Sequence, residues 1–117
     1  MHSRESQFGF SVALGEKTGV QVPEPGLARR IGAHNTSLML VENTVQAGFE
    51  GSWHSHPHNQ IIYVVDGRVS LRVGNADHEL ATRDSAIIDG GVEHRLVAIE
   101  TSIVLDIFSP RREDFLV

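Results

Sequence analysis

Residues 48–67 read GFEGSWHSHPHNQIIYVVDG and contain the densest histidine cluster of a chain that has seven histidines. His54 and His56 are two positions apart, so on an extended strand their side chains lie on the same face. Pro57 has no backbone N–H and is expected to end the pairing of that strand. Gln60 begins a β-branched and aromatic run, which we expect to fold back beside the first strand with the amide oxygen near both imidazoles.

A fourth donor is expected from the segment GGVEHRL, where His94 follows a double-glycine turn and starts a strand. Three neutral imidazoles and one amide oxygen suit a divalent first-row metal, with positions left for water or substrate. These ligands do not choose among zinc, nickel, iron, manganese and cobalt. The alternative interpretation is a solvated histidine-rich turn, and His58 is expected to face either solvent or the mouth of a cavity. The other histidines lack such a context and are expected on the surface or in the core: His2, His34 and His78.

The remaining pattern predicts one all-β domain. Residues 1–36 are rich in glycine and proline and are expected to form a tail with one or two short strands, and residues 37–117 are expected to form a β-barrel. Short strands separated by glycine turns are typical of a sandwich or barrel. Strands are expected at residues 38–45, 60–66, 68–73, 78–81, 85–88, 94–99 and 102–108, and RREDFLV at the end is expected to form one turn.

Composition excludes several classes of function. A net charge of −5 and a pI near 5.7 argue against nucleic acid or an anionic membrane as the main partner. The absence of cysteine excludes disulfides, thiolate metal sites and cysteine nucleophiles. The first ten residues, MHSRESQFGF, lack the apolar run of a signal peptide, so a cytoplasmic location is expected.

The stretch between Gly48 and Gly67 resembles the first motif of the cupin (RmlC-like) superfamily: glycine, five residues, His-x-His, three residues, an acidic or amide ligand, six residues, glycine. Gln60 stands where many cupins have glutamate. The second motif is matched at Gly91 and His94, whereas Arg83, Asp89 and Ala98 replace its usual glycine, proline and asparagine. The resemblance implies a single-domain double-stranded β-helix, or jelly roll, with the metal at one end, and a homodimer.

A narrower likeness covers residues 27–117. RRIGAHNTSLMLVENTV, HSHPHNQIIYVVDG and LDIFSPRREDFL resemble the pectin-degradation cupin group, which acts on 4,5-unsaturated uronate monosaccharides from polysaccharide lyases and converts them to linear keto sugar acids. The resemblance implies that Asp106, Phe108 and Arg112 are catalytic residues.

The chemistry of a uronate is consistent with these residues. A guanidinium binds a carboxylate through two hydrogen bonds, and Arg112 is the first candidate for this contact, with Arg111 as the alternative. Ring opening and tautomerisation need a positioned carboxyl group, for which Asp106 is the candidate. Phe108 lies two residues further on the same strand face and is expected to pack against the sugar, whereas Trp53 is expected on the face opposite the cavity.

Two other interpretations stay open. The same ligand set serves a metal-dependent cupin dioxygenase of the quercetinase type or a polyketide cyclase. A third possibility, from another class, is a non-catalytic sugar- or metal-binding module. Fold does not decide between these functions, so the site must.

Overall fold

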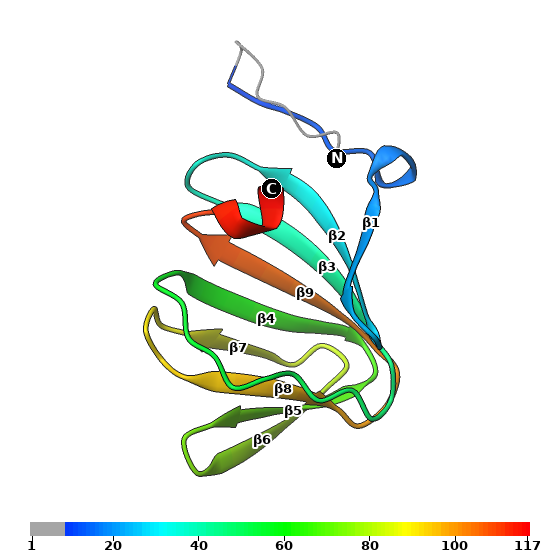
Figure 1. The fold of residues 1–117 in the computed structure, drawn as a ribbon, viewed down its shortest axis with the longest axis vertical. Coiled ribbons are helices and arrows are strands. Elements are labelled where there is room, and N and C mark those ends of the chain that lie inside the picture. The colour runs from blue at the N-terminus through cyan, green and yellow to red at the C-terminus, as the bar shows by residue number, and fades with distance from the viewer. Residues whose placement is uncertain (1–8) are drawn as a thin grey trace.

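The computed structural model describes residues 9–117, which form two antiparallel β-sheets and two single turns of 3-10 helix (Figure 1). The elements are η1 (Gly15–Lys17), β1 (Val20–Glu24), β2 (Leu27–His34), β3 (Met39–Val45), β4 (Asn59–Asp66), β5 (Arg68–Val73), β6 (Ala76–Ala81), β7 (Ser85–Ile88), β8 (His94–Ala98), β9 (Ser102–Ser109) and η2 (Glu113–Leu116). The all-β prediction is confirmed. β5 and β7 have the predicted bounds, and η2 is the predicted final turn. No helix within residues 9–117 is long and apolar enough to span a membrane.

The larger sheet has the strand order β1-β2-β3-β9-β4-β7, and the smaller has the order β6-β5-β8 (Figure 1). β2 has eight residues and pairs with β3 from Leu27↔Val45 to His34↔Met39. The larger sheet therefore includes β1 and β2, which lie within residues 1–36, the segment expected to form a tail with one or two short strands. The pairing of β2 with β3 joins this segment to residues 37–117, the expected barrel. This pairing places inward residues of β2, Leu27 and Arg29, beside the cavity between the sheets.

The interior lies between the sheets and follows the alternation of β4 and β9. Ile62 and Val64 of β4 and Val104 of β9 point inward and join an apolar cluster with residues of the smaller sheet. The cluster of buried residues is completed by Val45, Val69, Leu71, Ile88 and Ala98. Each fully buried aliphatic side chain of this kind contributes about 1.5–3 kcal/mol relative to exposure. This cluster anchors one end of strands whose other ends carry polar residues.

The double-glycine turn before β8 clasps the segment that carries the histidines. The backbone N–H of Gly91 donates to the carbonyl of His56 at 2.8 Å, and the N–H of Gly90 donates to Asn59 Oδ1 at 2.9 Å. A Cβ atom at position 90 would collide with the carbonyl of Pro57, so only glycine allows this approach. The turn thus fixes the start of β8 against the histidine segment.

Candidate metal centre and active site

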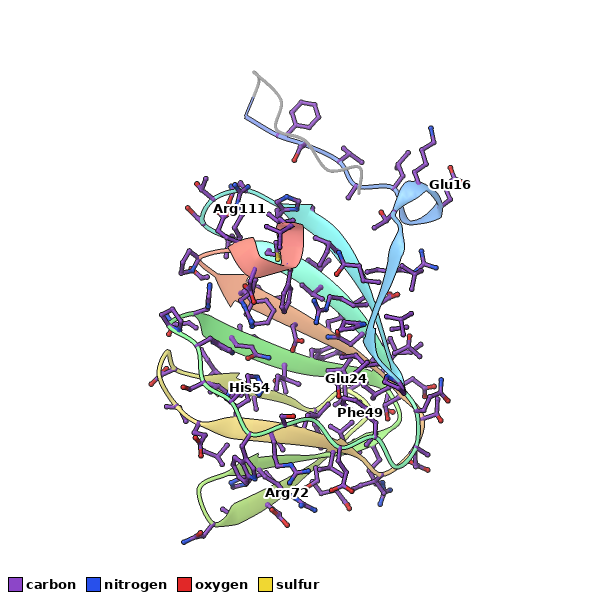
Figure 2. All side chains as sticks on the ribbon, in the orientation of Figure 1. Glu16, Glu24, Phe49, His54, Arg72 and Arg111 are labelled. Atoms are coloured by element: carbon purple, nitrogen blue, oxygen red, sulfur yellow. The ribbon has the colours of Figure 1, made fainter. Side chains whose placement is uncertain are left out.

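Two of the predicted ligands are neighbours through their backbones. The N–H of His54 donates to the carbonyl of His94 at 3.0 Å, and the N–H of His94 donates back at 2.9 Å. The predicted pairing of the histidine segment with the strand of Gln60 is wrong, because that strand pairs with β7 and β9. Figure 2 places His54 on the long segment between β3 and β4.

The three imidazoles converge on one point. The ring centroids of His54 and His94 lie 4.4 Å apart. The ring centroid of His56 lies 5.7 Å from that of His54 and 5.2 Å from that of His94. One nitrogen from each ring lies within 4.8 Å of the other two. The sequence-predicted triad is therefore brought together by the fold, and no other group of this kind is found within residues 9–117.

Each imidazole is held in one tautomer by a backbone carbonyl two residues away. Nδ1 of His54 lies 2.9 Å from the carbonyl of Ser52, Nδ1 of His56 lies 3.1 Å from that of His58, and Nδ1 of His94 lies 2.9 Å from that of Val92. Since a carbonyl oxygen only accepts, each Nδ1 carries the hydrogen. With the hydrogen on Nδ1, the neutral form of each ring directs the lone pair of its Nε2 atom away from the backbone, as in histidine ligands of metals.

Gln60 brings an amide oxygen to the same point. Its Nε2 donates to Asp106 Oδ1 at 2.9 Å, which fixes the orientation of the amide. Its Oε1 then lies 2.9 Å from Nε2 of His56. With the hydrogen of His56 on Nδ1, this contact joins two acceptor atoms. A cation between or beside them removes this mismatch.

The protonation of the cluster also suits a cation. Burial lowers the pKa of His56 and the pKa of His94 below the usual value for histidine, so both rings are neutral at pH 7. Nε2 of His94 is buried and has no hydrogen-bond partner among the described residues. A buried, unpartnered lone pair is costly unless a ligand or ion uses it. These observations fit three imidazoles and one amide oxygen around a divalent ion.

Asp106 lies on the neighbouring strand β9, where it pairs with Ile62 and contacts Gln60 diagonally. Its Oδ1 accepts from Gln60 and its Oδ2 accepts from Nδ2 of Asn43 at 2.7 Å. Burial raises the pKa of Asp106 to about 6, although both hydrogen bonds oppose this shift. The carboxyl group thus changes protonation near neutral pH, as a proton-transferring group must.

Asn43 is a site residue that motif reasoning missed. It alternates with Val41 and Val45 on β3, and both neighbours are fully buried. A polar residue within an inward apolar alternation was the signal that could have identified it.

Phe108 and Arg112 lie at the other side of the carboxyl group. The buried Phe108 ring packs edge-on against His56 and Phe115, with centroid distances of 5.7 Å in both cases. Arg112 lies over the Phe108 ring at 5.0 Å and over the Phe115 ring at 4.2 Å. Its Nε and Nη2 donate to Asp114 at 3.0 and 2.8 Å. Arg112 therefore lines the cavity with part of its guanidinium already paired.

Arg111 points elsewhere. Its Nε donates to Glu113 at 2.8 Å, and its backbone N–H donates to the carbonyl of Thr36. Figure 2 shows Arg111 near the β2–β3 turn, away from His54. Arg111 is also not among the residues that line the cavity. The geometry thus distinguishes the two adjacent arginines that spacing left open.

Most of these side chains line one cavity of about 310 Å³ between the sheets. Its polar lining residues are Glu24, Arg29, Asn43, Ser52, His54, Gln60, His94, Asp106 and Arg112. Phe49, Phe108 and Phe115 contribute aromatic surface. A mostly apolar concave site with a few convergent polar groups is typical of small-molecule binding.

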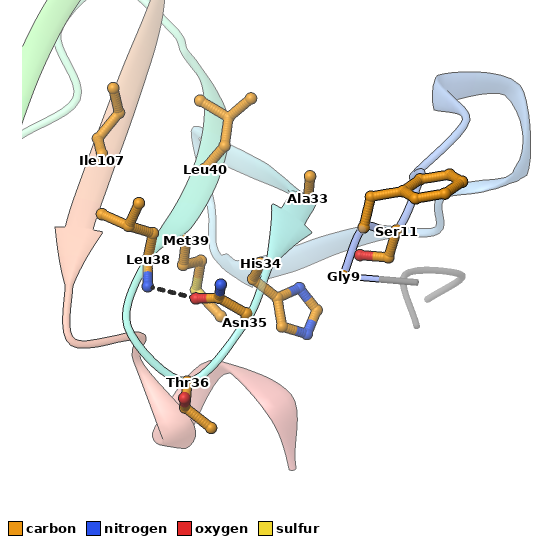
Figure 3. Close-up of a pocket in the computed structure, with 11 residues that line it drawn as sticks. Gly9, Ser11, Ala33, His34, Asn35, Thr36, Leu38, Met39, Leu40 and Ile107 are labelled. Carbon is orange, nitrogen blue, oxygen red and sulfur yellow. Dashed lines mark hydrogen bonds between the residues drawn. The ribbon is translucent and has the colours of Figure 1, made fainter. Parts of the chain in front are cut away.

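A larger hollow of about 600 Å³ lies outside the sandwich, between the segment at Gly9–Ser11 and the β2–β3 turn (Figure 3). The hydrogen bond drawn there joins the N–H of Leu38 to Asn35 Oδ1 and closes the turn itself. The predicted metal ligands and catalytic residues do not line this hollow.

The remaining histidines lie outside the triad. His58 is half-buried, with its ring 6.2 Å from that of Phe108, and it is not one of the three converging imidazoles. His34 is half-buried and His78 is exposed, whereas His2 lies outside the described residues. Trp53 is 42% exposed and does not line the cavity, as expected from its place beside His54.

Comparison with known proteins identifies related chains. Residues 41–108 match the family model of the cupin domain. The pectin degradation protein KdgF of Dickeya dadantii is 33% identical over 93 residues, which are 78% of this chain and 84% of that protein.

Solved structures of two proteins are also similar to this chain. The structure of KdgF from Halomonas sp. is 36% identical, with a TM-score of 0.84 over 90% of this chain and 99% of that chain. An RmlC-like cupin from Shewanella frigidimarina is 34% identical, with a TM-score of 0.86 over 98% and 99% of the two chains.

Proposed function

This chain belongs to the cupin family, and from that premise we propose that it is a metal-dependent enzyme that converts a 4,5-unsaturated uronate monosaccharide to its linear keto form. The similarity to the two KdgF proteins, one of them a pectin degradation protein by name, supports this class of substrate. The observation that carries the proposal is the Gln60 side chain. It contacts the imidazole cluster through its oxygen and a carboxyl group of raised pKa through its nitrogen, within one cavity.

The proposed metal ligands are His54, His56, Gln60 and His94. The common direction of their donor atoms and the unpartnered Nε2 of His94 support this assignment. When bound, a divalent ion supplies Lewis-acid polarisation of a substrate oxygen, and its full charge is retained because all four ligands are neutral. The preference among zinc, nickel, iron, manganese and cobalt is not set by this donor set.

The reaction is an isomerisation with two proton transfers. The hydroxyl proton on C1 leaves as the bond between C1 and the ring oxygen breaks, which produces an aldehyde at C1 and an enolate at C5. A proton then adds to C4, and the enolate oxygen becomes the oxygen of the C5 ketone. We assign both transfers to Asp106, which accepts the first proton as a carboxylate and returns a proton as an acid.

The neighbours of Asp106 hold the carboxyl group for this task. Gln60 and Asn43 each donate to one carboxylate oxygen, so the group cannot turn away from the cavity without losing both bonds. Phe108 and Arg112 line the same cavity. We assign Phe108 to contact with the apolar face of the sugar and Arg112 to placing positive charge near the substrate carboxylate.

The size of the cavity favours this substrate over the alternatives. A volume of about 310 Å³ is near the lower end for ligand sites and suits a monosaccharide better than a polycyclic aromatic. The large planar substrates of a quercetinase-type dioxygenase or a polyketide cyclase need a wider space. The open cavity beside a convergent donor set supports turnover rather than a non-catalytic role.

The test is turnover of unsaturated galacturonate by protein loaded with each candidate metal in turn. Loss of the enol absorbance should be faster than the spontaneous reaction with at least one metal and should return to the spontaneous rate after chelation. The absence of acceleration with every metal-loaded form would contradict the proposed function.

We also propose that the enzyme is a homodimer. Leu40, Ile107, Ile61 and Ile87 are paired neighbours on four adjacent strands of the larger sheet, and all point outward. Their exposed fractions are 38%, 37%, 39% and 68%. A continuous apolar row of this kind supports an interface between two copies. Light scattering of the wild type and of Ile87→Asp measures whether the dimer depends on this row.

A further inference from the structure

We propose that Arg29 binds the carboxylate of the substrate through its free guanidinium group. This inference rests on the proposed action on a uronate and adds a residue that the sequence motifs did not include. Motif spacing offered only Arg112 or Arg111 for this contact.

Arg29 faces the cavity because of its place in the alternation of β2. It stands between Leu27 and Ile31, and these three residues share the inward face. Ile31 is buried in an apolar cluster with Phe108, and Leu27 packs against the other apolar cluster. Arg29 is itself half-buried and lines the same cavity as Asp106 and His54.

The Arg29 guanidinium has no acceptor within residues 9–117. It forms no hydrogen bond and no ion pair there. Burial lowers the pKa of its guanidinium, and Asp114, Asp106 and Glu24 are near enough to oppose this shift. The adjacent Arg30 shows the contrast, because its Nη1 donates to the carbonyls of Gly15 and Thr18. A half-buried cation without an acceptor, open to a cavity, favours binding of an anion.

Phe115 orients Arg29. The guanidinium carbon lies 3.7 Å from the centre of the Phe115 ring, which is a close cation–π contact. The carbonyl of Phe115 accepts from Nε2 of Gln21 at 3.3 Å, which ties η2 to β1. With its carbon over the ring face, the guanidinium keeps N–H groups free to donate to a carboxylate in the cavity.

Arg112 is less suited to this contact as the only cation. Two of its nitrogens already donate to Asp114 in a bidentate pair, so its preferred carboxylate-binding fork is occupied. Arg112 also stacks on Phe115, at 4.2 Å. Among the residues that the structure describes, the Arg112 guanidinium is therefore paired with a carboxylate, whereas the Arg29 guanidinium has no acceptor.

The experiment compares wild type, Arg29→Met, Arg29→Lys and the matched control Arg30→Met. Each is assayed with unsaturated galacturonate and with its methyl ester, which lacks the negative charge. For the free acid, Arg29→Met should raise KM by about 10- to 100-fold and change kcat by less than about threefold, since a charge-assisted bidentate contact is lost. Arg29→Lys should recover part of the loss, and Arg30→Met should behave as wild type.

The ester separates binding from a structural role. If Arg29 only supports Phe115, Arg29→Met weakens turnover of acid and ester equally, and this result would overturn the proposal. An unchanged KM for the acid would overturn it as well. The proposal requires a loss that is confined to the acid.

A binding measurement keeps this inference separate from the proposed function. Calorimetry with saturated galacturonate, which cannot react, should give about 10-fold weaker binding to Arg29→Met than to wild type and no difference for galactose. If wild type does not turn over unsaturated galacturonate but this difference is found, the proposed reaction is wrong and the carboxylate site stands. If wild type binds galacturonate no better than galactose, the carboxylate site is wrong.

Discussion

The inward faces of β4 and β9 each have an apolar half in the core and a half that lines the cavity, which we call the polar half although it also contains Phe108. Val64 and Val104 are paired and fully enclosed in the apolar cluster. A few residues along the same two strands, Gln60 and Asp106 are hydrogen-bonded to each other in the cavity. The same alternation and the same backbone pairing therefore produce a core at one end and a reactive site at the other.

Stability and function depend on different halves of these two strands. In the apolar half the inward aliphatic side chains lower the free energy of the folded state by leaving water. In the polar half a carboxyl group, an unpaired imidazole nitrogen and an unpaired guanidinium are kept in partly buried positions at a cost. Such costs are usual where a site is preorganised for a ligand.

Replacing the carboxyl group of Asp106 with an amide should have the largest effect on activity. Asp106→Asn removes the proton carrier while it keeps the size of the side chain, so kcat should fall by about 10²- to 10⁴-fold. The measurement is loss of the enol absorbance by the metal-loaded enzyme. Asp77→Asn, an equal change on exposed β6, is the control and should retain activity. Full activity of Asp106→Asn would exclude the proposed role.

Removal of one imidazole should separate metal binding from folding. His94→Ala should weaken binding of the divalent ion by more than about 100-fold, since one of the four proposed ligands is lost, as measured by competition with a chromogenic chelator. His78→Ala, on an exposed strand position, is the control. Equal metal affinity of His94→Ala and wild type would contradict the ligand assignment.

The matching change in the apolar half should have the opposite pattern. Val64→Ala leaves a cavity in the core and should lower the free energy of unfolding by about 2 kcal/mol. Metal affinity and kcat should change by less than about threefold, because Val64 does not line the cavity. Denaturant unfolding and the activity assay measure the two effects. A large loss of metal affinity would show that the two halves are coupled.

The polar half, through Asp106, should make stability depend on pH. The pKa of Asp106 is about 6 in the folded protein against an ordinary value of 3.8, so ionisation opposes folding increasingly from about pH 4 to pH 6 and constantly above. Metal-free Asp106→Asn should therefore be more stable than the metal-free wild type at pH 8, by roughly 1–2 kcal/mol, and nearly equal at pH 4. Thermal unfolding at several pH values measures this difference. A constant difference would contradict the raised pKa.

The smallest effect is expected just outside the site. Arg111 pairs with exposed Glu113, and such surface pairs contribute less than about 1 kcal/mol. Arg111→Ala should therefore change kcat/KM by less than about twofold, whereas Arg112→Ala should lower it by more than about tenfold. Steady-state kinetics with both variants measures this contrast. Similar losses of kcat/KM in both variants would contradict the assignment of Arg112, and not Arg111, to the cavity.

The sequence predicted the parts of this molecule that local pattern controls. Strand positions followed from alternation and glycine turns, and β5 and β7 have the predicted bounds. The histidine triad followed from a motif whose spacing is short and specific. Its convergence is confirmed by the nitrogen positions of His54, His56 and His94.

Long-range pairing was beyond the reach of local pattern. Nothing in the chain between His54 and His94 indicates that their backbones pair with each other, because β-sheet partners are chosen by the packing of the whole sandwich. Arg29 was overlooked for a related reason. Residues 1–36 around it are rich in glycine and proline, and only its place between Leu27 and Ile31 indicated an inward face. Its lack of an acceptor among the described residues depends on the assembled cavity.

The three bonds from imidazole Nδ1 to nearby backbone carbonyls have a consequence for reconstitution. Each ring is oriented by a carbonyl only two residues away, so the entropy of arranging these ligands is lost when the chain folds and not when the ion arrives. A single preparation freed of metal should then accept different ions in one geometry. Spectroscopically visible surrogates such as Co²⁺ would consequently report on the native coordination sphere.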